Sequence, residues 1–189
     1  MIIRELSIAE IKKTYREHLK ADFPADELKP LAMILRSYRQ GNYLCLGAFD
    51  GEDIAGYAYF VFYGRICLLD YFAVVRGRRG QGIGSEFLKQ FKMPELCSRC
   101  DFLLIEVEDP FQSDAPDTAT RLKRLDFYLR GGAVNTGVHA RVFGVDYALL
   151  EYPLTGAAHT GEEAADAYGK LYGSLLPGLL FKSQIFIRT

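Results

Sequence analysis

The feature that most restricts how this chain can fold is a strand that runs, through three alternating glycines, into a helix. Residues 66–75 are rich in β-branched and aromatic side chains, as strands are. Gly80, Gly82 and Gly84 follow this run. An amphipathic helix comes next, with an apolar face formed by Ile83, Phe87, Leu88 and Phe91. Glycine permits the sharp turn that such a transition needs, because it lacks a Cβ. The segment therefore predicts a strand–turn–helix unit.

The rest of the chain also contains both strand-like and helix-like spacings of apolar residues. Ser7 predicts the start of the first helix, with Glu10 as its capping-box partner, and a second helix is expected over about 26–40. Strands are predicted at 2–6, 43–49, 54–63, 66–75, 102–107, 147–152 and 184–188, and later helices at 120–130 and 161–175. This order predicts an α/β (α+β) fold, in which a mixed, mostly antiparallel sheet is flanked by helices. We expect one domain over residues 1–155, with a C-terminal helix and strand extension, 156–189, packed on it.

Composition excludes several classes of protein. The 189 residues carry a net charge of −1, whereas proteins that bind nucleic acid usually show a clear basic excess. The longest uncharged apolar stretch is too short for a membrane span, and the N-terminus lacks the apolar core of a signal peptide. We therefore expect a cytoplasmic protein with neither nucleic acid nor membrane as a partner. Cys97 and Cys100 form one C-x-x-C without a second Cys/His pair nearby, so reduced thiols and no metal site are expected.

The glycine-rich turn has the features of an anion-binding site. The first turn of a helix has unpaired N–H groups and a partial positive charge, and glycines let a phosphate approach them closely. Arg79 adds a charged donor, and Arg76 and Arg78 complete a local basic cluster. A Walker loop would need a lysine that is missing here, and the glycine spacing does not fit a dinucleotide fingerprint. The expected ligand is a phosphate or pyrophosphate, and the alternative is a tight turn whose glycines serve packing alone.

The segment Arg79-x-x-Gly82-x-Gly84 resembles the R/Q-x-x-G-x-G/A acyl-CoA signature of the GNAT superfamily of N-acetyltransferases. The preceding residues 72–74 look like the hydrophobic strand end of that family. The order of predicted elements is similar to that of the family from about residue 2 to residue 152. The resemblance implies a GNAT fold and an acyltransferase that uses acetyl-CoA as its acyl donor.

The resemblance also implies which residues bind the donor. In GNAT proteins the main chain at the strand end hydrogen-bonds the pantetheine arm, which maps to Phe72, Ala73 and Val74. The turn and the helix start hold the pyrophosphate, which maps to Arg79, Gly80, Gln81, Gly82, Ile83, Gly84 and Ser85. Many members have a proline where this chain has Arg76, and we expect Arg76 or Arg78 to reach the CoA phosphates instead.

Tyr128 is the expected general acid. Phe127-Tyr128, late in a predicted helix, resembles the Phe-Tyr pair of the family, whose tyrosine often protonates the departing thiolate. A phenol suffices as donor, because the reference pKa of a thiol is about 8.5. The alternative is a partly buried core tyrosine with a bonded hydroxyl.

Asp70 is a candidate for the base, because it interrupts the apolar run of residues 68–72. Aspartate is disfavoured in strands, and its burial costs free energy unless it has partners. Strand alternation places it on the same face as Phe72 and Val74. Several GNAT proteins carry an acidic residue on this strand that deprotonates the amine, usually through water. The alternative is a structural aspartate bonded to neighbouring backbone.

Glu106 and Glu108 are the expected acceptor-binding residues, and they share one face of the strand at 102–107 and its end. Carboxylates that line the cleft would favour a cationic amine, and Glu106 is also a second candidate for the base. The alternatives are a solvated strand end, or ion pairs with Arg121 and Arg124.

The sequence thus predicts an N-acetyltransferase that transfers the acetyl group of acetyl-CoA to a primary amine of a small molecule or peptide. We expect direct attack in a ternary complex, without a metal. The alternative is a non-catalytic GNAT-fold module that binds acyl-CoA as a sensor or scaffold, and a third possibility is another donor such as succinyl-CoA. Residues 156–189 are expected to extend the acceptor wall or to form a homodimer contact.

Overall fold

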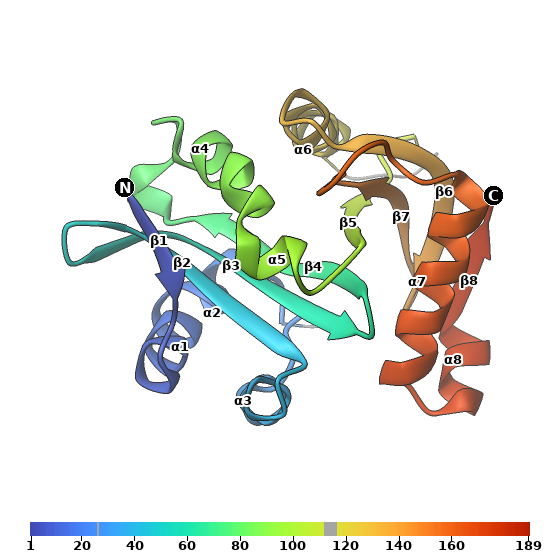
Figure 1. Ribbon diagram of the computed structural model, residues 1–189, viewed down its shortest axis with the longest axis horizontal. Coiled ribbons are helices and arrows are strands. Elements are labelled where there is room, and N and C mark those ends of the chain that lie inside the picture. The colour runs from blue at the N-terminus through green and yellow to red at the C-terminus, as the bar shows by residue number, and fades with distance from the viewer. Residues whose placement is uncertain (26, 112–116) are drawn as a thin grey trace. The chain divides into compact units, whose positions relative to one another are not determined.

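A computed structural model describes residues 1–25, 27–111 and 117–189 of the chain. These residues form two compact units. The first consists of Met1–Val61 and Leu69–Gln90, and the second of Phe62–Leu68 and Phe91–Thr189 (Figure 1). The chain therefore passes into the second unit at the tip of one hairpin, returns, and leaves again after residue 90.

The first unit is built on four strands, which lie in chain order within the sheet. They are β1 (Ile2–Glu5), β2 (Tyr43–Asp50), β3 (Asp53–Tyr63) and β4 (Ile66–Val74), the last two of which extend into the second unit. β2 pairs antiparallel with both β1 and β3. The helices are α1 (Ile8–Thr14), the π-helical turn η1 (Tyr15–Leu19), α2 (Lys20–Asp22), α3 (Leu31–Arg39), the 3-10 turn η2 (Arg76–Arg78) and α4 (Ile83–Lys89).

Helices cover both faces of this four-stranded part, as neighbouring residues of β3 show. The Tyr57 hydroxyl donates a 2.9 Å hydrogen bond to Asp22 at the end of α2. Gly56 faces α4 instead, since a Cβ at this position would lie 3.6 Å from Phe87 and 3.1 Å from the carbonyl oxygen of Ala73. Figure 1 shows α4 on the opposite side of β3 from α1 and α3. The absence of a side chain at residue 56 thus lets α4 and the end of β4 approach β3 closely.

The second unit contains four antiparallel strands in the order β5-β7-β6-β8. They are β5 (Phe102–Glu108), β6 (Val134–Val142), β7 (Val145–Glu151) and β8 (Ile185–Arg188). The helical elements are the 3-10 turn η3 (Gln90–Lys92), α5 (Pro94–Cys97), α6 (Thr118–Arg130), α7 (Gly161–Leu175) and α8 (Gly178–Gln184). α7 begins with a capping box of Thr160 and Glu163, and it lies against β5, β6 and β8. None of the described helices is both long and apolar enough to cross a membrane.

The elements agree with the expected α+β class, but several differ from the expectation, among them the short helices α5 and α8, which were not predicted. β6 was not predicted, although Val138, Ala140 and Val142 are buried in alternation along it. The second helix begins at Leu31 and not near residue 26, with Pro30 as its N-cap, because proline is tolerated at the start of a helix but not in its interior. Residue 26 itself, and residues 112–116 of the loop at 109–118, lie outside the described residues.

Candidate functional site

The glycine-rich turn joins the end of β4 to α4. Gly80 and Gly82 have φ values of +78° and +79°, in the left-handed region that only glycine enters without strain. Among the described residues, apart from the chain neighbours, no atom lies within 4 Å of a Cβ built at either position, so these glycines serve the backbone shape and not a crowded contact. Gly82 is the N-cap of α4, which has no side-chain cap, while its carbonyl oxygen accepts the Glu86 N–H at 3.0 Å. The N-cap therefore offers no side-chain acceptor to the N–H groups of the first turn. The remaining residues of the predicted pyrophosphate site are exposed or half-buried, namely Gln81, Ile83, Gly84 and Ser85.

The strand end before this turn is held by three contacts. Phe72 packs edge-on against Phe87 of α4, with ring centroids 5.5 Å apart. The Val75 N–H donates to the Ala55 carbonyl of β3 at 3.0 Å. Arg79 Nε donates to the Val74 carbonyl, also at 3.0 Å. The strand end and the turn that the resemblance assigns to the donor thus form one continuous piece of the first unit.

Asp22 binds Arg76 and Arg79, which both precede the glycines of this turn, and the sequence did not single it out. Its carboxylate accepts from Arg79 Nη2 at 2.7 Å and from Arg76 Nε at 3.3 Å, both on Oδ1. The other oxygen accepts the Tyr57 hydroxyl, and only 4% of the Asp22 side chain is exposed. Burial, with the Asp22 carboxylate as the second cause, raises the pKa of Tyr57 above its ordinary value, so this phenol stays a donor. The partners lie 35 to 57 residues away along the chain, which is why no local pattern revealed them.

The Asp70 side chain is 8% exposed and has two side-chain partners, the ammonium group of Lys29 and the hydroxyl of Tyr43. Burial, followed by the charge of Asp70, raises the pKa of Tyr43 well above its usual range. The adjacent Tyr71 contacts the same loop, because its hydroxyl accepts the Lys29 N–H at 2.8 Å and donates to the Glu27 carbonyl at 2.9 Å. Asp70 and Tyr71 are neighbours on β4, and both contact Lys29. Regular strand alternation would instead place their side chains on opposite faces of the sheet.

Tyr128 lies near the end of α6 and is 7% exposed. Its ring packs edge-on against Phe127, with centroids 5.1 Å apart. Burial raises the pKa of Tyr128 above its ordinary value, and the positive charge of Arg124 offsets only part of that increase. The phenol is therefore protonated at neutral pH, as a hydrogen-bond donor to a developing thiolate must be.

Glu106 and Glu108 lie on β5 and have different partners. Glu106 Oε1 accepts the hydroxyls of Tyr168 and Tyr172 from α7, the latter at 2.7 Å. Glu108 forms ion pairs with two arginines of α6, at 3.0 Å to Arg121 and 2.8 Å to Arg124. Glu108 thus forms the ion pairs with Arg121 and Arg124 that the sequence offered as an alternative. Glu106 joins β5 to α7.

The predicted site residues divide between the two units. Asp70 and the residues predicted to bind the donor belong to the first unit, and Tyr128, Glu106 and Glu108 belong to the second. Within the described residues, no group of three or more His, Cys, Asp or Glu side chains is arranged to hold a metal ion.

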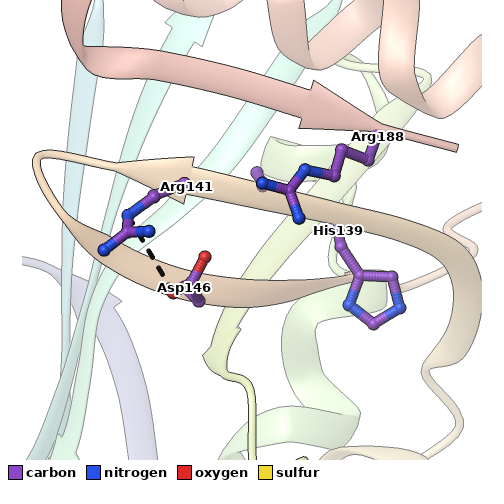
Figure 2. Close-up of a pocket in the computed structure, with 5 residues that line it drawn as sticks. His139, Arg141, Asp146 and Arg188 are labelled. Atoms are coloured by element: carbon purple, nitrogen blue, oxygen red, sulfur yellow. Dashed lines mark ion pairs between the residues drawn. The ribbon is translucent and has the colours of Figure 1, made fainter. Parts of the chain in front are cut away.

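A small pocket in the second unit contains none of the predicted site residues. Figure 2 shows the Arg188 side chain from β8 beside Arg141 and His139 of β6, with Arg141 and Asp146 forming an ion pair of 4.0 Å. Ala140 completes the lining. The pocket is a local feature of the β6–β7–β8 region and carries no part of the donor turn.

Comparison with solved structures finds N-acetyltransferases that are similar in fold to this chain. A ribosomal-protein-S18-alanine N-acetyltransferase from Escherichia coli is 18% identical, with 84% of this chain and 96% of that chain covered and a TM-score of 0.60. An aminoglycoside 6'-N-acetyltransferase from Enterococcus faecium gives 16% identity, coverage of 84% and 100%, and a TM-score of 0.62. An aminoglycoside 6'-N-acetyltransferase in complex with coenzyme A gives 16% identity, coverage of 84% and 100%, and a TM-score of 0.61. At these identities the likeness establishes the fold.

The family of this chain follows from comparison of its sequence with a family profile. A search of curated proteins found no match. The profile of the Acetyltransferase (GNAT) family, however, matches residues 9–115, which is more than half of the chain and includes β4, the glycine-rich turn and α4. The chain therefore belongs to the GNAT family of acetyltransferases.

Proposed function

We propose that this protein is an acetyl-CoA-dependent N-acetyltransferase, which transfers the acetyl group to a primary amine by direct attack in a ternary complex. The observation that carries the proposal is the left-handed turn at Gly80 and Gly82, placed between the end of β4 and the uncapped start of α4. This backbone presents N–H groups to an anion, which fits the pyrophosphate of coenzyme A. Family membership selects an acyl-CoA from the possible phosphate ligands.

The donor supplies an activated thioester, and the residues of the chain bind and orient it. Main-chain groups of Phe72, Ala73 and Val74 are proposed to bond the pantetheine arm. The turn from Arg79 to Ser85 is proposed to hold the pyrophosphate. The Arg79 side chain is bound to the Val74 carbonyl and to Asp22, which favours a role in shaping the turn.

Proton transfer needs one donor and one acceptor. Tyr128 is the proposed donor to the departing thiolate, supported by its neutral, buried phenol. Asp70 and Glu106 are the two candidates for the group that accepts the proton of the amine. Asp70 is already paired with Lys29, so it would act through water or after release of that pair.

The acceptor class is proposed from the carboxylate of Glu106. Two phenols hold Glu106 Oε1 in place, so the position of this negative charge is fixed by α7. A fixed carboxylate favours a cationic amine over a neutral nucleophile through charge-assisted hydrogen bonds. Glu108 is a weaker candidate, because both of its oxygens are engaged by arginines.

The deciding experiment measures thiol release from acetyl-CoA with a panel of polyamines, amino acids, aminoglycosides and peptide N-termini. Release that depends on one amine class, with the acetylated amine found by mass spectrometry, supports the enzyme. Binding of CoA by calorimetry without turnover across the panel would instead favour a sensor or scaffold. Faster thiol release from succinyl-CoA than from acetyl-CoA would identify succinyl-CoA as the donor and leave the proposed reaction type unchanged.

A further inference from the structure

The end of α2 contributes a carboxylate to the border of the donor turn. Asp22 accepts hydrogen bonds from Arg76, Arg79 and Tyr57, and its side chain is 4% exposed. A buried carboxylate is unfavourable unless charged or hydrogen-bonding partners compensate it. These donors come from two places, the turn and β3. Asp22 is therefore the point at which α2, β3 and the turn are joined.

Arg79 is fixed at two positions of its guanidinium group. Nε donates to the Val74 carbonyl at 3.0 Å, and Nη2 donates to Asp22 at 2.7 Å. Val74 is the last residue of β4, and Gly80 directly follows Arg79. A planar group bound at both ends has little rotational freedom, so it sets the distance between the strand end and the first glycine of the turn.

Arg78, which lies between Arg76 and Arg79 in the chain, provides an internal comparison. It forms an ion pair with Asp50, whose side chain is 66% exposed. Exposed ion pairs contribute little to structure, since water competes for both partners. The turn thus has one arginine tied to an exposed carboxylate and two tied to a buried one.

We propose that Asp22 is a positioning residue for the acyl-CoA donor, which holds Arg79 and Arg76 so that the turn keeps the shape that accepts the pyrophosphate. The inference rests on the proposed donor site and goes beyond it, because Asp22 does not itself bind the donor. It also makes the segment at the end of α2 part of the determinants of donor affinity.

The charge of Asp22 gives the proposal a sharp test. Coenzyme A is a polyanion, so removing a nearby carboxylate should strengthen its binding if charge alone matters. A positioning role has the opposite sign, because the released arginines no longer hold the turn. The direction of the change therefore separates the two effects.

The experiment measures the Kd of CoA by calorimetry for wild type, Asp22→Asn and the matched control Asp50→Asn, with thermal melting as the check on folding. We expect Asp22→Asn to weaken CoA binding about tenfold and Asp50→Asn to leave it within twofold. Unchanged or tighter binding by Asp22→Asn, or an equal loss in both variants, would overturn the proposal. A wild-type chain that does not bind CoA would refute the donor site itself, which is a different result.

Two further variants keep the test decisive. Asp22→Glu retains the charge and lengthens the side chain by one methylene group, so a loss of CoA affinity in this variant comes from geometry; an unchanged Kd contradicts the proposal. In the cycle of Asp22→Asn with Arg79→Gln, we expect the loss in the double variant to be smaller than the sum of the two single losses, because Asp22 acts in part through Arg79. Additive losses would show that Asp22 acts independently of Arg79.

Discussion

The Tyr172 hydroxyl of α7 donates a 2.7 Å hydrogen bond to Glu106 Oε1, and the Tyr168 hydroxyl donates to the same oxygen. Glu106→Gln retains an oxygen for both phenols and removes only the charge. We expect KM for a cationic amine to rise about tenfold, equivalent to about 1.4 kcal/mol, with little change in the free energy of unfolding. Steady-state kinetics and urea denaturation check both parts. Glu106→Leu is the control that also loses the hydrogen bonds, and it should cost about 1–3 kcal/mol of stability.

Variants of Asp70 and of its ion-pair partner Lys29 test whether Asp70 is the general base. Asp70→Asn should lower kcat about 100-fold, the usual contribution of a general base, while the Kd of CoA is retained. Lys29→Met keeps the carboxylate and removes its ionic partner. Turnover by Lys29→Met well above that of Asp70→Asn would support the base. Two variants that lose stability equally and keep the wild-type kcat would assign Asp70 a structural role alone.

Tyr128→Phe removes one hydroxyl from a buried ring and should lower kcat about 10- to 100-fold, with little effect on CoA affinity. Because the pKa of Tyr128 is raised above its ordinary value of 10.0, its phenol remains neutral throughout the usual assay range. The pH profile of the wild type should therefore show no descending limb from this group below about pH 10. A kcat equal to that of the wild type would remove Tyr128 from the reaction.

Gly82→Ala tests the backbone of the turn, and Gly77→Ala is its matched control. An L-residue at φ +79° costs about 1–2 kcal/mol, whereas Gly77 has no left-handed φ and no atom within 4 Å of a Cβ. We expect Gly82→Ala to weaken CoA binding at least tenfold and Gly77→Ala to leave it nearly unchanged. Equal affinities in the two variants would contradict the need for the left-handed turn.

Glu10 makes stability depend on pH. Hydrogen bonds from Arg4 and from Ser7 in the capping box lower its pKa from 4.5 to about 2. A carboxyl group with a lower pKa in the folded chain stabilises the fold above the unfolded value and loses that contribution as the pH falls through the folded value. The difference in Tm between wild type and Glu10→Gln should therefore be largest at neutral pH and shrink between about pH 4.5 and pH 2. A difference that stays constant over this range would contradict the assignment.

Local patterns were sufficient for much of the fold. The capping box of Ser7 and Glu10 and the hairpin of β2 and β3 lie where periodicity placed them, because both depend on residues close in sequence. β6 was missed because none of residues 134–137 at its start is buried, and its pairing with β7 shifts register between Asn135 and His139. The buried alternation from residue 138 to residue 142 was the signal that could have revealed it.

The site was less accessible to sequence reasoning. The donor turn has a contiguous motif, so its residues could be named in advance. Asp22, Tyr168 and Tyr172 bind partners 35 to 66 residues away, and each lies in a segment without a motif. Such contacts depend on the tertiary fold, which brings single polar residues together from different elements.

The lack of nearby described atoms around a Cβ built at Gly80 or Gly82 determines which substitutions these two positions accept. Neither position is too crowded for a methyl group, yet both lie at values of φ that L-amino acids avoid. Selection at these sites therefore acts on chirality and not on size. A D-alanine introduced by chemical synthesis would favour the native backbone twist that L-alanine opposes.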